Sequence, residues 1–241
     1  MGSVLLEKKL SVIIPAYNEE ERIGQTLAEV TGYLDRRQYE YEVIVIDDGS
    51  GDSTPEKIAA VSKHHAAVRV LRLPVNRGKG EAVKAGISQA RYGHCLFMDA
   101  DNATSIREWD KFEPCFEQGA QAVMASRHLP GSKIVYAQPW SRRFLGAGYR
   151  ILCRGLFGIR TSDFNCGFKA YRTDLAKKVY AENQMTDWTF DVETLCRLRR
   201  CKIFFIEVPV TWTHHDKKAH LAPFRAAFRT FFSLIKLKRL F

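Results

Sequence analysis

Short apolar runs separated by polar segments dominate the first half of the chain. The runs lie at residues 10–14, 41–46, 68–73 and 95–98. Each is bounded by turn-forming residues, and each is short for a helix, so each predicts a buried strand. Pro15 is expected to end the first strand, because proline cannot donate to a sheet ladder.

The segments between these runs carry the signals of helix starts. Acidic residues at 19–21 predict a helix over residues 18–37, because carboxylates favour the positive end of a helix. Residues 53–56 (Ser-Thr-Pro-Glu) form a capping box that predicts a second helix. A third helix is expected over residues 81–91, after a basic, glycine-rich loop.

Strands that alternate with helices predict an α/β fold with a doubly wound, mostly parallel sheet flanked by helices. Polar turns follow three of the strands, at residues 15–19, 47–50 and 99–104. Ligands bind at the carboxyl ends of parallel strands, so these turns are expected to meet in one crevice. This arrangement indicates a nucleotide-type site.

The second half of the chain is less regular. The expected elements are a fifth strand (120–126), a loop (128–139), an arginine-bearing helix (140–157), a bent strand (163–171), a further helix (188–200) and a long strand interrupted by proline (202–213). No repeat, low-complexity linker or domain boundary is evident, so one domain over residues 1–241 is expected.

Asp99 and Asp101 follow the apolar run at 95–98. On a strand this spacing puts both side chains on one face. Paired carboxylates at this edge of a sheet suit a hard divalent cation and the phosphates that it carries, although a helix cap or a solvated turn is the alternative. No Rossmann glycine motif and no P-loop is present, and Thr104 stands where an EF-hand needs glycine.

The net charge of +10 points to an anionic partner: nucleic acid, a phosphorylated substrate or an acidic membrane surface. No zinc-finger, RNP-type or helix-turn-helix signal supports nucleic acid, so none is expected as a partner. No apolar stretch reaches the roughly 18 residues of a membrane-spanning helix, and the N-terminus lacks a signal-peptide core. The six cysteines form no C-x-x-C pair, which favours reduced thiols and a cytoplasmic location.

The C-terminal segment is amphipathic. An apolar stripe and a neighbouring basic stripe would lie on one helix, the first made of Phe224, Phe228, Phe231 and Ile235 and the second of Arg225, Arg229 and Lys236. A final helix packed on the domain and a helix lying on an anionic bilayer both fit this pattern.

Several motifs resemble those of the inverting family-two glycosyltransferases of GT-A fold: VIIPAYNE (12–19), VIDDGS (45–50), NRGKG (76–80) and DAD (99–101). Three more are similar to the polyprenyl-phosphate glycosyl synthases, most closely the dolichyl-phosphate glucosyltransferase branch: DFNCGFKAY (163–171), WTFDVE (188–193) and EVPVTWT (207–213). The resemblance implies a nucleotide-sugar-binding half (10–105), an acceptor half (106–213) and a basic amphipathic tail (214–241).

The resemblance also implies roles for individual residues. The nucleotide sugar would be held by Pro15, Ala16, Tyr17, Glu19, Ile46, Asp48, Lys79, Asp99 and Ala100. Asp99 and Asp101 would bind Mg²⁺ or Mn²⁺ bridging the diphosphate, and His214 or His215 could assist the metal. Packing or turn formation is the alternative role for Tyr17 and Asp48.

The acceptor decides whether a general base is needed. A polyprenyl phosphate is already ionised, since the second pKa of a phosphate monoester is about 6, and it needs cations to place it. Arg127, Arg142 and Arg143 are expected to bind its phosphate. Asp163 would orient these arginines or the sugar, and the expected catalytic residues are Asp101, Arg127, Asp163 and Asp191.

The predicted activity is therefore transfer of a hexose, with glucose from UDP-glucose as the leading choice, to a polyprenyl or dolichyl phosphate. The enzyme would work as a peripheral protein on the cytoplasmic membrane face, held there by its C-terminal helix. The alternative is a soluble glycosyltransferase acting on a saccharide or small-molecule hydroxyl, with Asp191 or Glu193 as the base.

Overall fold

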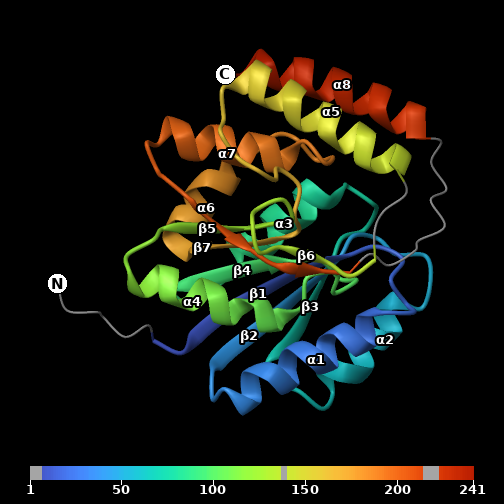
Figure 1. Ribbon diagram of the computed structural model, residues 1–241. Helices are drawn as coiled ribbons and strands as arrows, with labels where there is room; N and C mark the ends of the chain where they lie inside the picture. Colours follow the sequence, from blue (N-terminus) through green and yellow to red (C-terminus); the bar gives the residue numbers. More distant parts are fainter. Residues whose placement is uncertain (1–6, 137–139, 214–222) are drawn as a thin grey trace.

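A seven-stranded sheet runs through the centre of the molecule, in the order β3-β2-β1-β4-β7-β5-β8 (Figure 1). The computed structural model describes residues 7–136, 140–213 and 223–241, with only the backbone described at 141, 142 and 223–229. The strands are β1 (Lys9–Ala16), β2 (Glu40–Asp47), β3 (Val68–Arg72), β4 (His94–Met98), β5 (Ala122–Ser126), β7 (Phe168–Arg172) and β8 (Ile206–Pro209). Neighbours run parallel except β7, which is antiparallel to β4 and β5. The mostly parallel sheet is therefore confirmed.

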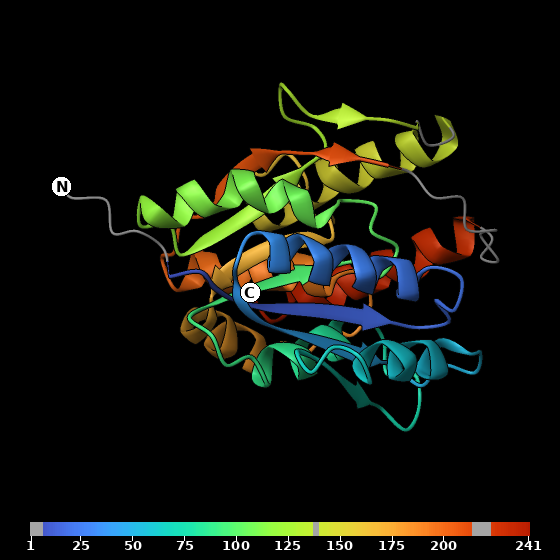
Figure 2. The ribbon, with the colours of Figure 1, turned by 90° about the horizontal axis from the view of Figure 1, so that it is seen from below.

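Helices cover both faces of the sheet (Figures 1 and 2). One face carries α1 (Ile23–Arg36), α2 (Thr54–Ser62) and α4 (Trp109–Glu117). The other carries α3 (Lys79–Ser88), α6 (Thr173–Ala181) and α7 (Phe190–Arg200), with α5 (Trp140–Phe157) and α8 (Pro223–Lys238) outermost. A short 3-10 helix, η1 (Ile106–Glu108), precedes α4, and β6 (Lys133–Ile134) pairs with β9 (Thr211–Trp212) in a small second sheet.

Alternate residues of the central strands enter opposite cores. In β1, Val12 and Ile14 belong to the core on the α1 side, whereas Ile13 belongs to the core on the α3 side. In β2, Val45 and Ile44 divide in the same way. Because both faces are buried, these strands read as nearly continuous apolar runs in the sequence.

The segment after β1 differs from its prediction. The strand continues through Pro15, which lies in register with Ile46 at the strand end. The helix begins at Ile23 rather than at residue 18, because Asn18 has a left-handed φ of 52° and the N–H of Glu19 donates to Oγ1 of Thr54 at 2.8 Å. The hydrogen bond to Thr54 links the loop after β1 to the start of α2, and residues 18–22 therefore do not join α1.

The capping box expected at residues 53–56 is wrong in detail. Ser53 makes no side-chain hydrogen bond to the start of α2. Oδ1 of Asp52 instead accepts from the backbone N–H and the hydroxyl of Thr54, at 3.0 Å and 2.6 Å. The helix is where the sequence places it, but another side chain holds its first turn.

In the second half, the helices α4 and α6 have no counterpart in the sequence prediction. The helix expected over 140–157 is confirmed as α5. Residues 163–167 form a loop, and the strand expected there begins only at Phe168. The long strand expected over 202–213 divides into β8 and β9, which belong to different sheets, at the point where Pro209 removes a donor.

The C-terminal helix α8 is present, but it packs through another stripe than the one predicted. Leu234 and Leu237 are fully buried against the core on the α3 side. Phe231 and Phe232 are 44% and 53% exposed, and their rings contact each other. The side chains of Phe224 and Phe228 lie outside the described residues. The helix is thus docked by leucines and presents phenylalanines outward.

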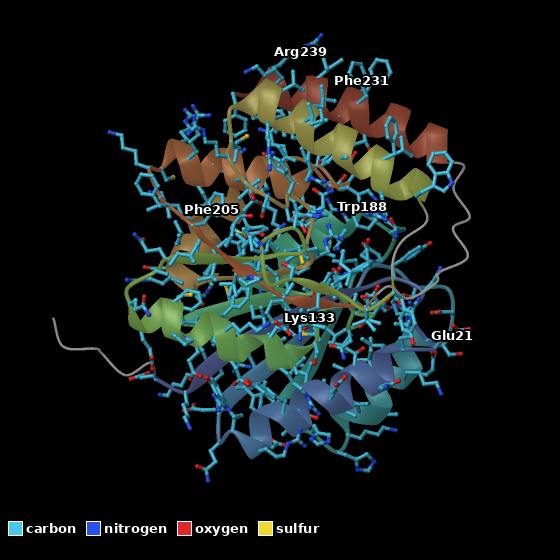
Figure 3. The ribbon with its side chains drawn as sticks, in the orientation of Figure 1. Glu21, Lys133, Trp188, Phe205, Phe231 and Arg239 are labelled. Atoms are coloured by element: carbon cyan, nitrogen blue, oxygen red, sulfur yellow. The ribbon has the colours of Figure 1, made fainter. Side chains whose placement is uncertain are left out.

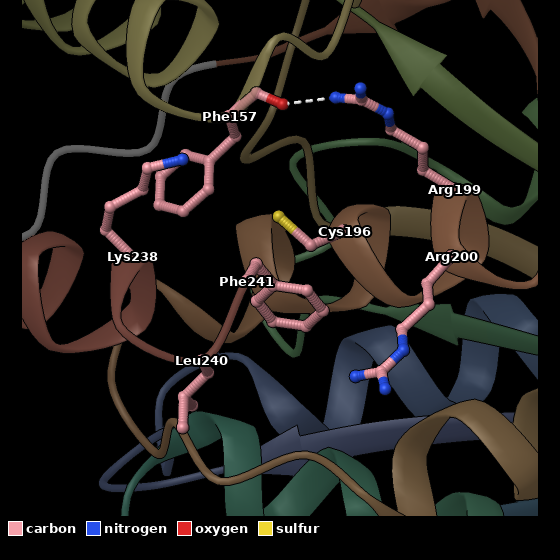
Figure 4. A pocket seen from close by; sticks show the side chains of 7 residues that line it. All are labelled: Phe157, Cys196, Arg199, Arg200, Lys238, Leu240 and Phe241. Carbon is pink, nitrogen blue, oxygen red and sulfur yellow. Dashed lines mark hydrogen bonds between the residues drawn. The ribbon is translucent and has the colours of Figure 1, made fainter.

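A pocket opens where α5, α7 and α8 end (Figure 4). It is lined by Phe157, Cys196, Arg199, Arg200, Lys238, Leu240 and Phe241. None of these residues belongs to the polar turns at the sheet edge. Within the described parts of the chain, no helix has the length and apolar character needed to cross a bilayer.

Candidate functional site

The polar turns after β1 and β2 are joined by hydrogen bonds. The N–H of Asp48 donates to the carbonyl of Ala16 at 2.9 Å. The N–H of Asn18 donates to Oγ of Ser50 at 3.0 Å, and Oδ1 of Asn18 accepts from the N–H of Gly51 at 3.0 Å. The structure therefore brings these two turns together at the carboxyl edge of the sheet.

Asp48 fastens the glycine-rich loop at residues 76–80 to the same edge. Its two carboxylate oxygens accept from the N–H groups of Arg77 and Gly78, at 2.8 Å and 2.9 Å. Gly78 has a φ of +96°, which favours glycine at this position. The neighbouring Asp47 is fully buried and accepts from the N–H of Ser50 at 2.9 Å. Both acids thus have structural partners, and a nucleoside contact by Asp48 stays a prediction.

The other residues predicted to hold the nucleoside differ in how far their side chains are exposed. Tyr17 is 46% exposed at the turn after β1. Glu19 is buried, and its Oε2 lies 3.2 Å from Nη2 of Arg22. Ile46 is fully buried in the core under α3, where it packs against Gly86, so its side chain is not exposed to a ligand. Ala16 is also buried, and it offers only backbone groups to a ligand.

Lys79 and Asp99 form an ion pair at the start of α3. Nζ of Lys79 lies 2.6 Å from Oδ1 of Asp99, and it sits over the rings of Phe97 (5.3 Å) and Trp188 (4.9 Å). Trp188, labelled in Figure 3, is 56% exposed. Burial alone would lower the pKa of Lys79, but the negative charges of Asp99 and Asp191 outweigh it and raise that pKa. The ammonium group therefore stays charged beside the acidic turn.

Gly167 makes room for the Asp99 carboxylate. A Cβ at Gly167 would lie 2.0 Å from Oδ2 of Asp99, which no real side chain tolerates. The N–H of Asp99 also donates to the carbonyl of Gly167 at 3.0 Å. The glycine of the motif at 163–171 is therefore required by the acidic turn that it faces.

Asp99 and Asp101 fit a divalent cation. Oδ1 of Asp101 accepts from the N–H of Ala103 at 3.1 Å, while the carbonyl of Ala100 accepts from Oγ1 of Thr26 at 2.7 Å, so the turn is held from both sides. Among the described residues, no three His, Cys, Asp or Glu side chains gather as a metal site. Two carboxylates completed by phosphate and water oxygens are how Mg²⁺ usually binds. His214 and His215 lie outside the described residues.

Arg127 is held by Asp163 at the carboxyl end of β5. Nε and Nη2 of Arg127 lie 2.6 Å and 2.9 Å from the two oxygens of Asp163, and the guanidinium carbon lies 5.3 Å from the ring centre of Trp212. Burial alone would raise the pKa of Asp163, but the charge and hydrogen bonds of Arg127 keep that pKa well below its usual range. The pair is bidentate, mostly buried and ionised at neutral pH.

Among the described side chains of α5, the arginine near Arg127 is Arg150, whereas the two predicted there were Arg142 and Arg143. Arg143 is exposed, and the side chain of Arg142 lies outside the described residues. Arg150 instead comes close: its Nη1 lies 2.9 Å from Nε2 of His128, and its charge acts on both Arg127 and Asp163. The structure therefore adds Arg150 to the cations of this region.

The two carboxylates proposed as a general base are both inaccessible. Asp191 is 1% exposed and is ion-paired with Lys169, whose Nζ also donates to the carbonyl of Phe164 at 2.8 Å. Glu193 is fully buried, and it accepts from the N–H groups of Gln184 and Met185 and from Arg197. Neither is exposed to an acceptor hydroxyl, so the expectation that one of them acts as base is not supported.

Four residues of the motifs at 163–171, 188–193 and 207–213 have a structural role that the sequence did not predict: Gly167, Lys169, Trp188 and Trp212. Gly167 makes room for Asp99, and Lys169 forms an ion pair with Asp191. The ring of Trp188 lies under Lys79, and the ring of Trp212 lies under Arg127. The signal that could have found Lys169 is a lone charge inside an apolar strand, since a buried lysine needs a carboxylate partner.

Known proteins resemble this chain over most of its length. The family model described as glycosyl transferase family 2 matches residues 11–180. The chain is 38% identical to the dolichyl-phosphate beta-glucosyltransferase of Drosophila melanogaster, covering 90% of this chain and 70% of that protein. It is 35% identical to the human protein of the same name, covering 90% and 71%.

Solved structures share the fold. Glucosyl-3-phosphoglycerate synthase from Mycobacterium tuberculosis, in complex with Mn²⁺, UDP and phosphoglyceric acid, matches with a TM-score of 0.70 and 19% identity, covering 95% of this chain and 78% of that chain. A mannosyltransferase from Pyrobaculum calidifontis, in complex with GDP-Man and Mn²⁺, matches with a TM-score of 0.61 and 20% identity, covering 91% and 60%. The family, the GT-A fold and the enzyme class implied by the motifs are thereby confirmed. The chain belongs to glycosyl transferase family 2.

Proposed function

We propose that this chain transfers glucose, with inversion at the sugar carbon, from UDP-glucose to a dolichyl or related polyprenyl phosphate. The names of its relatives support the sugar and the acceptor. The single observation that carries the proposal is the contrast between carboxylates and cations at the crevice. Asp191 and Glu193 are buried in ion pairs, while Arg127 is fixed but still 20% exposed.

On the donor side, defined here by Lys79, Asp99 and Asp101, the diphosphate of the nucleotide sugar would bind. Asp99 and Asp101 would hold Mg²⁺ or Mn²⁺, which neutralises charge on the departing diphosphate when it is bound. Lys79 places a further positive charge next to the same turn. The structures related by fold support this arrangement, since they contain Mn²⁺ together with UDP or GDP-Man.

On the acceptor side, defined by Arg127, Asp163, Trp212 and Arg150, the acceptor phosphate would bind. The ion pair with Asp163 uses Nε and Nη2 of Arg127, so Nη1 stays outside that pair. A guanidinium fixed in this way suits a phosphate oxygen. An ionised phosphate attacks without losing a proton, so no base is needed.

We also propose that α5 and α8 rest on the cytoplasmic face of a membrane. The two helices lie side by side at one end of the molecule (Figure 1). Trp140, Phe144 and Ile151 of α5 are 80%, 75% and 70% exposed at helical spacing, and Phe231 of α8 is 44% exposed. Exposed aromatic residues among basic ones are typical of helices that lie at a lipid interface.

The test is a screen of sugar nucleotides against a short polyprenyl phosphate and against the matching polyprenyl alcohol. We expect transfer from UDP-glucose to the phosphate alone, loss of transfer with EDTA and recovery with Mn²⁺. A β-linked product, identified by NMR, would establish inversion. Equal transfer to the alcohol would contradict the proposal and favour a hydroxyl acceptor with a general base.

A further inference from the structure

Lys79 stands where it must compete with a metal ion. Its Nζ lies 2.6 Å from Oδ1 of Asp99, one of the two carboxylates that fit a divalent cation. A cation bound to this oxygen and an ammonium group at hydrogen-bonding distance would repel each other strongly. The two positive charges therefore cannot occupy these positions together.

The Asp99 carboxylate cannot easily turn away from this competition. On one side it lies against Gly167, where even a Cβ would come within 2.0–2.3 Å of its carboxylate atoms. On the other side it meets Lys79. Lys79 can move more easily than Asp99. Its Nζ lies 4.9 Å and 5.3 Å from the ring centres of Trp188 and Phe97, and a long, flexible side chain can shift over aromatic rings without a clash. When a cation arrives, the lysine is the group that moves.

A second carboxylate is placed to receive it. Asp191 is 1% exposed and pairs with Lys169 through Oδ1, whereas its Oδ2 has no hydrogen-bond partner among the described residues. Lys169 lies in register with Phe97, whose ring is under Lys79. The residue before Asp191 packs against Gly80, next to Lys79. An unpaired buried carboxylate oxygen is costly, so a charged donor is favoured there.

We propose that Lys79 is a metal-responsive positioning residue. It neutralises Asp99 while the site lacks a cation, and it is released towards Asp191 and the donor diphosphate when the cation binds. The inference rests on the metal site of the proposed function and adds two consequences. Lys79 weakens the binding of metal to the free enzyme, and it turns to the donor only in the metal-loaded site.

The test is a titration of the full chain with Mn²⁺ alone, followed by EPR of the free ion, without nucleotide. We expect Lys79→Met to bind Mn²⁺ about tenfold more tightly than the wild type, because only the wild type must first break the ion pair between Lys79 and Asp99. Lys84→Met is the matched control. Lys84 lies on the same helix and donates to the carbonyl of Asn183 at 3.0 Å, so its loss removes the same charge and should leave Mn²⁺ affinity unchanged.

Equal or weaker Mn²⁺ binding by Lys79→Met would overturn the inference. A crystal structure with Mn²⁺ supplies a second readout, in which Nζ of Lys79 should lie beyond hydrogen-bonding distance of Asp99; an ion pair that persists would also overturn it. If the wild type transfers glucose but Lys79→Met binds Mn²⁺ with the affinity of the wild type, the inference about Lys79 is wrong and the proposed function stands. Mn²⁺ binding by neither protein, with or without UDP, would remove the metal site and the inference together.

Discussion

The turns of the donor side are joined largely by hydrogen bonds between backbone N–H groups and side-chain oxygens, whereas the acceptor side depends on one bidentate ion pair. For example, the carboxylate of Asp48 accepts hydrogen bonds from two N–H groups of the loop at 76–80. On the acceptor side, Asp163 holds Arg127, and Trp212 covers the guanidinium. Loss of one side chain removes only some of the several hydrogen bonds that join the donor-side turns, while an ion pair fails when either partner is lost. Mutations should therefore act very differently on the two sides.

The largest effect is expected from Asp101→Ala. Loss of one of the two carboxylates that fit the cation should lower kcat for glucosyl transfer by about 10³-fold, because the departing diphosphate loses its charge neutralisation. Transfer of radiolabelled glucose to a short polyprenyl phosphate measures this. Asp174→Ala is the control, since Asp174 is an exposed acid paired with Arg172. Undiminished transfer by Asp101→Ala would refute the assigned site.

A smaller, one-sided effect is expected from Asp163→Asn. The amide cannot hold Arg127 by charge, so KM for the acceptor phosphate should rise by about 10- to 100-fold while KM for UDP-glucose changes little. Steady-state kinetics with each substrate varied in turn separates the two values. A larger rise in KM for the donor would place Arg127 on the donor side instead.

Gly167→Ala tests the contact between the two sides. The added methyl group would collide with the Asp99 carboxylate, so we expect Mn²⁺ affinity and kcat to fall by about tenfold or more. Gly155→Ala on α5 is the matched control, because a Cβ there meets nothing within 4 Å. It should retain activity and gain slightly in thermal stability.

The pH dependence should follow the acceptor and not the enzyme. The folded pKa of Asp163 is depressed, so its ion pair with Arg127 is present above the ordinary pKa of an aspartate and is lost only as pH falls through the depressed value. The acceptor phosphate takes up a proton below about pH 6. We expect kcat/KM for the acceptor to be level above about pH 7 and to fall about tenfold per unit well below pH 6, and initial rates across that range measure it.

The smallest effect is expected from Phe231→Ser combined with Phe232→Ser. Binding to anionic vesicles, measured by sedimentation, should weaken by about 3- to 10-fold, while activity on a short soluble acceptor stays unchanged. Point substitutions are better than removal of α8, because Leu234 and Leu237 belong to the core. Vesicle binding equal to that of the wild type would refute the proposed membrane face.

The contrast between the two sides also explains what could be read from the sequence. The strands and turns of the donor side were predictable, because each motif is continuous and Asp99 and Asp101 are neighbours in the chain. The acceptor side joins residues that are distant in sequence. The approach of Arg150 to Arg127 depends on the direction of α5, which no local pattern specifies.

Burial was the second property that the sequence did not show. Asp191 and Glu193 near the start of a helix look like accessible acids, yet Lys169 and Arg197 hold them in the interior. Burial also distinguishes the apolar residues of α8: Leu234 and Leu237 are buried, although they are no more apolar than the exposed Phe231. Which apolar face packs is decided by α5 and α7, the helices that it meets.

The reversed direction of β7 gives the donor side and the acceptor side of the crevice one shared loop. Because β7 runs against β4 and β5, its first residue lies where those two strands finish, and the loop before it enters the crevice. One short loop therefore holds Arg127 through Asp163 and makes room for Asp99 at Gly167. A slip of a single residue in this strand would put Cys166 or Phe168 against Asp99, and it would disturb the donor side and the acceptor side at once.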